Sequence, residues 1–243
     1  MLKISSVLKL ITASLAIGAA SIAGAGPLTI GEQVYVENKA GDAFTPSSVS
    51  GDSNGLYSSV SFQLNGSGGV STSAGLFVLD YSRNNATDWT QFLTFCLEPD
   101  VFLTPFSNPY AVNAVGSAGS PLYPAGLISE LWGRYRGAVV NDVAAAAFQV
   151  SLWELAYGTT DLNLSTGAFR LTSGGAVGTL ASTWLSSLNG SGPMASGLVV
   201  LVNNQRMADR QDLITQNVPE PTTLALFGLG LLGFGISRRR KQN

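Results

Sequence analysis

Histidine is missing from this chain of 243 residues, and cysteine occurs only once, at Cys96. Without histidine the chain cannot build a Ser-His-Asp or Cys-His catalytic group, or a histidine-ligated zinc site. A single cysteine also excludes an intramolecular disulfide. Charged residues are scarce, at 12% of the sequence. The chemistry that remains rests on carboxylates, amides, hydroxyls and one thiol, and we expect neither a cofactor nor a metal.

The first 25 residues are typical of a secretory signal peptide. A lysine-containing start precedes an apolar stretch from Leu10 to Ile22, and Ala23-Gly24-Ala25 follows as an A-x-A cleavage site. We therefore expect the Sec export machinery to carry the chain across the inner membrane, with residues 1–25 removed.

The last 26 residues have three parts in a fixed order. Val218-Pro219-Glu220-Pro221 comes first, the uncharged run 222–237 second, and Arg238-Arg239-Arg240-Lys241 third. The prolines fix their own φ angles and hold the residues before them extended, so the first part is a stiff peptide that no sheet can absorb. The run 222–237 predicts a transmembrane helix that is short for a bilayer, with the basic residues on its cytoplasmic side.

This tail resembles the PEP-CTERM sorting signal of Gram-negative bacteria, which has the same three parts. The resemblance implies recognition by exosortase, an inner-membrane enzyme that acts near the Pro-Glu-Pro. It implies a protein that is anchored in the inner membrane, or released at the cell surface or into the extracellular matrix. It also implies an association with exopolysaccharide and biofilm production, and it assigns no chemistry to the exported part.

The exported part is acidic. All 15 acidic residues but only seven of the 13 basic ones lie between residues 26 and 220, which gives this part a net charge of −8. A strongly acidic surface repels phosphate groups. This argues against nucleic acid or anionic lipid as a partner.

The chain between the two targeting segments predicts one α+β ectodomain at 26–205 and a linker at 206–217, and the stretch 203–217 could also be a strand followed by a linker. Short apolar runs between turn residues predict strands, which are Leu28–Ile30, Val34–Val36, Val60–Leu64, Leu76–Leu79, Phe92–Leu97 and Gly197–Val202. Three helices are expected from their caps and composition, namely Leu127–Tyr135, Asp142–Tyr157 with Asn141 or Asp142 as cap, and Ala176–Leu188. We expect a β-sandwich-like sheet with a helical subdomain.

One pair of residues in the ectodomain has chemical potential. Cys96 ends a predicted strand, and Gln149 lies inside the alanine-rich helix. Gln149 and Trp153 are four residues apart, so they share a helix face. The structural alternative is that Cys96 is a small buried hydrophobe and Gln149 bonds to backbone.

The stretches Phe95-Cys96-Leu97-Glu98 and Gln149-Val150-Ser151-Leu152-Trp153 resemble the thioester domains of bacterial surface adhesins, over residues 75–190. The usual Thr-Gln-x-Ala form is Phe148-Gln149-Val150-Ser151 here. The resemblance implies an internal thioester between Cys96 and Gln149, shielded from water by Phe95 and Trp153. A nucleophile on a target surface, such as an amine or a polysaccharide group, would then attack the Gln149 carbonyl. Such an adhesin reacts once and is not an enzyme.

Two other functions fit the sequence. One is a non-covalent structural component of a biofilm or exopolysaccharide matrix, exported by the same route. The other is an envelope hydrolase that uses carboxylates such as Glu98 and Asp100, which flank Pro99. The same two acids suggest calcium ligation, although two acids are common in a capped or solvated loop.

Overall fold

The computed structural model describes residues 26–37, 55–85, 87–101, 109–117, 124–158, 161–203 and 211–217. The signal peptide expected at 1–25 and the tail expected at 218–243, with its transmembrane helix at 222–237, lie outside the described residues. Within the described ranges, no helix has both the length and the apolar character needed to cross a membrane.

In the part of the chain that the structure describes, eight antiparallel strands form one sheet, in the order β1-β5-β7-β8-β4-β3-β2-β6. Their bounds are β1 Gln33–Glu37, β2 Gly55–Leu64, β3 Val70–Ser82, β4 Thr90–Cys96, β5 Tyr110–Ala114, β6 Phe169–Ser173, β7 Leu198–Val202 and β8 Leu213–Gln216. Strand β1 also pairs with β3, so six strands close into a ring, and β2 and β6 extend beyond it.

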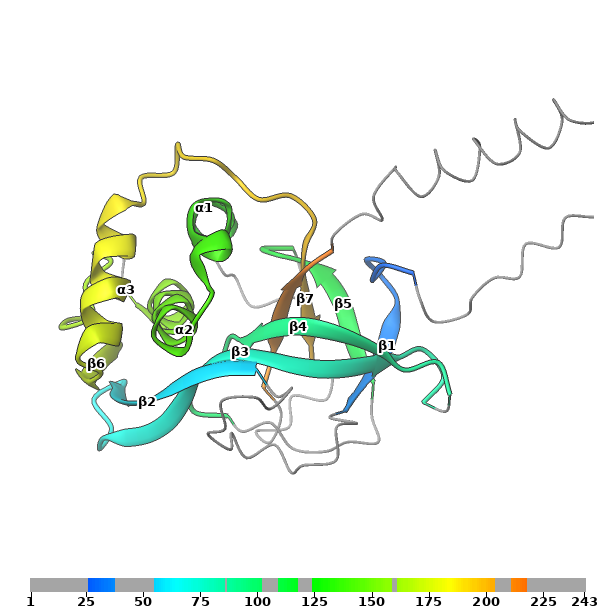
Figure 1. Cartoon of the computed structure of the whole chain (residues 1–243), viewed down its shortest axis with the longest axis horizontal. Coiled ribbons are helices and arrows are strands. Elements are labelled where there is room, and N and C mark those ends of the chain that lie inside the picture. The colour runs from blue at the N-terminus through cyan, green and yellow to red at the C-terminus, as the bar shows by residue number, and fades with distance from the viewer. Residues whose placement is uncertain are drawn as a thin grey trace, which may run out of the picture.

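The closed ring differs from the sandwich that the sequence led us to expect. The ring closes because the 13-residue strand β3 is long enough to pair with two strands along one edge. Residues 70–77 of β3 pair with β2, and residues 80–82 pair with β1. Two separate sheets therefore do not form. The α+β class holds, with the sheet on one side and the helices on the other (Figure 1).

The described residues form three α-helices, α1 Ala125–Tyr135, α2 Asp142–Tyr157 and α3 Ala176–Ser187, and a short 3₁₀ turn, η1 Arg136–Ala138, follows α1. All three confirm the expected positions. The Asn141 side chain caps α2 by accepting a hydrogen bond from the Ala144 amide at 2.9 Å, and Gly158 ends the helix. Helix α2 is apolar on nearly every side, which suits its position between α1, α3 and the sheet (Figure 1).

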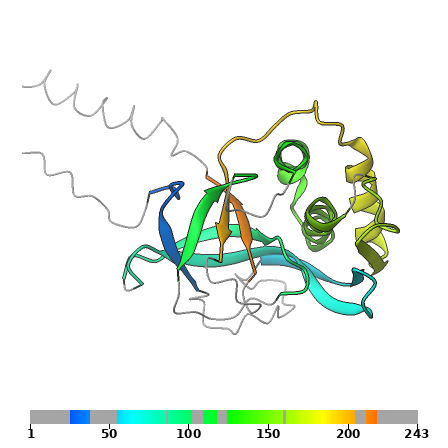
Figure 2. The ribbon, with the colours of Figure 1, turned by 180° about the vertical axis from the view of Figure 1, so that it is seen from behind.

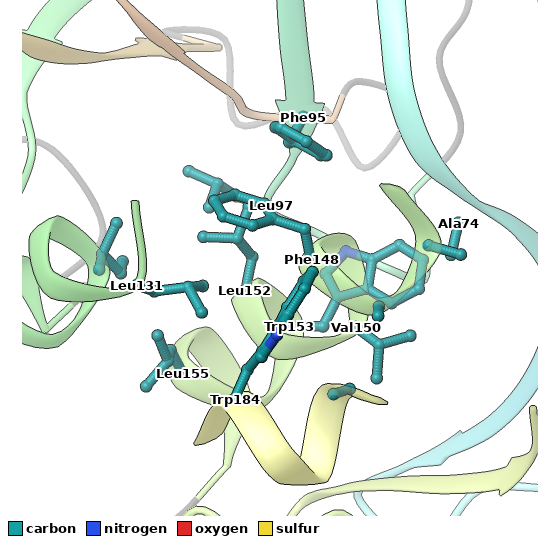
Figure 3. Close-up of a cluster of buried hydrophobic side chains, with 14 of the residues drawn as sticks. Ala74, Phe95, Leu97, Leu131, Phe148, Val150, Leu152, Trp153, Leu155 and Trp184 are labelled. Carbon is teal, nitrogen blue, oxygen red and sulfur yellow. The ribbon is translucent and has the colours of Figure 1, made fainter. Parts of the chain in front are cut away.

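The interior has two apolar cores. One lies between the helices and the sheet, where Phe95 and Leu97 meet Phe148 and Trp153 (Figure 3). The other is built from residues that line the ring, and it contains Cys96. Successive side chains of a strand point to opposite faces. Strand β4 therefore contributes Phe95 to the helix-side core and Cys96 to the ring core.

Several strands were not evident in the sequence. The run expected as a strand at Leu28–Ile30 is irregular, whereas β5 and β6 appear where none was expected. Strand β8 lies inside the expected linker at 206–217 and is almost fully buried between β4 and β7. The ectodomain sheet thus continues to Gln216.

Candidate functional site

Cys96 and Gln149 meet at the end of β4. Strand β3 pairs with β4 only as far as Thr94, so on this edge no strand of the described residues lies beside the backbone of Cys96. The Gln149 side chain occupies this place: the Cys96 amide donates to Gln149 Oε1 at 2.9 Å, and Gln149 Nε2 donates to the Cys96 carbonyl at 2.5 Å. The side-chain amide thus substitutes for a residue of a neighbouring strand.

Both residues are sealed from solvent. Gln149 has no exposed surface, and Cys96 is 1% exposed. Burial raises the pKa of the Cys96 thiol well above its usual range, and the negative charge of Glu98 adds to the effect. The thiol is therefore neutral at rest, and the reactive thiolate is scarce.

The two residues expected to shield the pair, Phe95 and Trp153, are also buried. The Phe95 ring lies 4.7 Å from the Phe148 ring, and Trp153 lies 5.8 Å from Phe62, both measured between ring centroids. Figure 3 shows Phe95, Phe148 and Trp153 gathered around the middle of α2. The helix side of the site is an aromatic, water-excluding wall.

Glu98 and Asp100, the acids that suggested a hydrolase or a calcium site, have different environments. A Glu98 carboxylate oxygen accepts a hydrogen bond from the Asp212 amide at 2.8 Å, and Asp100 is exposed. Burial and the nearby Asp212 raise the pKa of Glu98 to about 7. In the part of the chain that the structure describes, no three potential ligands among His, Cys, Asp and Glu are grouped to hold a metal.

Glu154, next to Trp153, is a buried carboxylate that the sequence did not single out. It has no exposed surface, and within the described residues neither carboxylate oxygen makes a full hydrogen bond, although the Asn163 backbone lies close enough to offset part of the effect of burial. Burial, and then the charge of Asp161, raise its pKa to about 7. A buried acid whose pKa is raised in the folded state makes stability depend on pH.

We expect the free energy of unfolding to fall as the pH rises from about 5 to about 8. Glu154 and Glu98 have folded-state pKa values of about 7, above their usual 4.5, so the folded state holds protons that the unfolded chain has released. This stability is present at low pH and is lost as the pH rises through 7. Urea unfolding at several pH values should show Glu154→Gln to be more stable than wild type at pH 8 by about 1–2 kcal/mol.

The pH slope of Glu154→Gln should be shallower than that of the wild type. Ser151→Ala, on the same helix, removes no titratable group and should leave the slope unchanged. Equal slopes in the wild type and Glu154→Gln would contradict the assignment of a raised pKa to Glu154.

The two ends of the described ectodomain are held together at Asn217. Its Oδ1 accepts from the Leu28 amide at 3.0 Å, and its Nδ2 donates to the Leu28 carbonyl at 2.6 Å. Its own amide donates to the Gly197 carbonyl at 2.9 Å. Figure 2 shows β1 and the end of β8 on the same side of the molecule, away from α3. The tail therefore leaves the ectodomain from a fixed point.

Residues 217–241 match the family model of the PEP-CTERM protein-sorting motif. The chain carries a PEP-CTERM sorting signal. The PEP-CTERM motif implies export, processing by exosortase and sorting at the cell envelope. The match begins at the clamped residue Asn217 and contains both Val218-Pro219-Glu220-Pro221 and Arg238-Arg239-Arg240. Comparison with curated proteins gives no match, and neither does comparison with solved structures.

Proposed function

We propose that this PEP-CTERM chain is a surface protein whose ectodomain forms an internal thioester between Cys96 and Gln149. The thioester would attach the protein to an amine or another nucleophile on a target surface. The observation that supports this proposal is the contact itself: a buried glutamine amide, 53 residues away in sequence, is hydrogen-bonded at both ends to the backbone of the single cysteine.

The chemistry balances without another reactant. Cys96 Sγ bonds to Gln149 Cδ, the Cδ–Nε2 bond breaks, and Nε2 leaves as ammonia with the thiol proton. Negative charge develops on Gln149 Oε1 during the attack, and the Cys96 amide already donates to that oxygen at 2.9 Å. A fixed donor at this position stabilises the transition state.

The environment suits a thioester that must survive until it meets its target. Phe95 and Trp153 are buried in the helix-side core, so they keep water from the side of the site that Gln149 occupies. The raised pKa of the Cys96 thiol makes closure slow. A slow step is tolerable because closure happens once in each molecule. A surface amine then forms an amide with Gln149 and releases the thiol, so the protein turns over once and is not an enzyme.

Intact-mass measurement of the purified chain tests the proposal. The wild type should be lighter than its sequence mass by one ammonia and should show no free thiol after denaturation. Methylamine should add to Gln149 and release one thiol. Cys96→Ala should have its full mass and be inert to methylamine. A wild-type chain of full mass with one titratable thiol would contradict the thioester.

A second candidate is a non-covalent structural protein of a biofilm or exopolysaccharide matrix. Two observations favour it: the Gln149 amide already completes the open edge of β4, and Cys96 belongs to the ring core rather than to the helix-side core. A full wild-type mass is the result that this candidate predicts. For the carboxylate hydrolase, the described residues show Glu98 accepting a hydrogen bond from the Asp212 amide and Asp100 exposed, and this arrangement does not single out a catalytic pair.

A further inference from the structure

A cavity of about 490 Å³ opens beside the point where the tail leaves the ectodomain. Its wall combines aromatic rings, side-chain amides and one guanidinium. The residues that matter below are Tyr81, Phe92, Trp132, Arg136, Gln216 and Asn217. The cavity therefore offers flat apolar surface together with one positive charge.

Arg136 is the charged member of this wall. Its guanidinium carbon lies 5.8 Å from the centroid of the Phe95 ring, and partial burial lowers its pKa. Arg83 pairs with Glu32 and Arg134 pairs with Glu130. Within the described ranges, Arg136 has no carboxylate beside it. A partly desolvated arginine of this kind favours an anionic partner.

The sequence carries a carboxylate a short distance after the cavity wall. Asn217 is fixed on the cavity wall by its hydrogen bonds to Leu28 and Gly197. Glu220 is the only acidic side chain after Asp212, and it follows Asn217 by three residues. Three extended residues span about 10 Å, which is comparable to the size of the cavity.

The peptide around Glu220 also suits an aromatic wall. Pro219 and Pro221 favour an extended polyproline conformation, and such peptides bind to grooves lined by aromatic rings. Tyr81, Phe92 and Trp132 supply these rings. The shape of the cavity, its positive charge and the short distance from Asn217 therefore all favour the peptide around Glu220 as its occupant.

We propose that Val218–Pro221 docks in this cavity and that the Glu220 carboxylate pairs with the Arg136 guanidinium. The folded ectodomain then holds its own sorting peptide, and exosortase has to compete with the cavity for it. The access of exosortase to the motif would depend on the ectodomain surface as well as on the tail. The docking involves neither Cys96 nor Gln149, so its test is independent of the test for the thioester.

Zero-length cross-linking of the full chain in detergent tests the docking. Arg136→Lys keeps the positive charge and supplies an amine, which a carbodiimide joins to a paired carboxylate with loss of water. Peptide mass spectrometry should find the introduced lysine linked to Glu220, and Glu220→Gln in the same background should abolish the link. Arg170→Lys is the matched control, because Arg170 is exposed on β6, the last strand in the sheet order, which does not line the cavity.

A missing cross-link, or a cross-link to Glu220 that is equally strong from position 170, would overturn the proposal. The cavity would then be a site for an external anion.

Proteolysis gives a second measurement. A proline-specific endopeptidase should cut after Pro221 about five-fold faster in Arg136→Gln than in wild type, which corresponds to a shift of about 1 kcal/mol. Equal cleavage rates would also overturn the docking.

Discussion

Replacing Glu130 with alanine is expected to lower the free energy of unfolding by about 3–5 kcal/mol. Glu130 lies on α1 and has no exposed surface. Its Oε1 accepts from Arg134 Nε at 2.8 Å and from the Gly192 amide at 3.1 Å. Its Oε2 accepts from the amides of Asn189 and Gly190 at 3.1 and 2.6 Å. Alanine would leave three backbone donors and a guanidinium without their acceptor.

The charge state of Glu130 strengthens this expectation. Burial alone would raise the pKa of Glu130, but the Arg134 hydrogen bond and the backbone amides outweigh it, so the pKa lies below its usual range. The ionised form is thus the native one. Its contribution to stability is present at neutral pH and is lost as the pH falls through the lowered pKa.

Denaturant unfolding at pH 7 measures the loss. Glu32→Ala is the control, because Glu32 forms a partly exposed ion pair with Arg83, and such pairs contribute about 0–1 kcal/mol. Glu130→Gln should fall between the two, since its amide keeps one acceptor oxygen. A loss in Glu130→Ala no larger than in Glu32→Ala would show that Glu130 does not anchor the segment 189–192.

The sequence alone could not reveal this role of Glu130. Within the predicted helix, a glutamate four residues before an arginine indicates an ordinary surface pair. The partners that make it structural lie about 60 residues away, in a segment that folds back over α1. Only the packing of that segment turns a surface charge into a buried one.

Features with local causes were predictable, and features with distant causes were not. Helix α2 has its cap, its alanine-rich body and its terminating glycine within 18 residues, and its predicted bounds are confirmed. Strand β8 has four residues and depends on β4 and β7 for its place. The pairing of β1 with β3 that closes the ring likewise has no local signal.

The candidate site shows the same division. Two short stretches of sequence predicted that Cys96 and Gln149 belong together, and the structure brings them into contact. The sequence did not predict that the amide would bind the backbone of Cys96 at the open edge of β4. That arrangement follows from the point where β3 stops pairing with β4, which depends on the whole sheet.

In the chain without a thioester, replacing Gln149 with methionine is expected to lower the free energy of unfolding by about 2–4 kcal/mol. Methionine preserves the size of the side chain, so the loss reports mainly the buried N–H and C=O of Cys96, which lose their partners. Ser151→Ala is the control. Ser151 is buried on the same helix, but its hydroxyl donates a hydrogen bond within that helix, to the Ala147 carbonyl. A loss no greater than that of Ser151→Ala would contradict this account of Gln149.

Cys96→Ala separates the structural role of the pair from its chemistry. It removes one buried sulfur and leaves the Gln149 hydrogen bonds in place, so without a thioester it should cost about 1 kcal/mol. A closed thioester adds the loss of a cross-link spanning 53 residues, which raises the cost of Cys96→Ala to about 4 kcal/mol or more. Unfolding of this one variant, read beside its intact mass, therefore reports whether the bond had formed. Variants of Gln149 do not report whether the thioester had formed, because they lose the hydrogen bonds to the Cys96 backbone in either case.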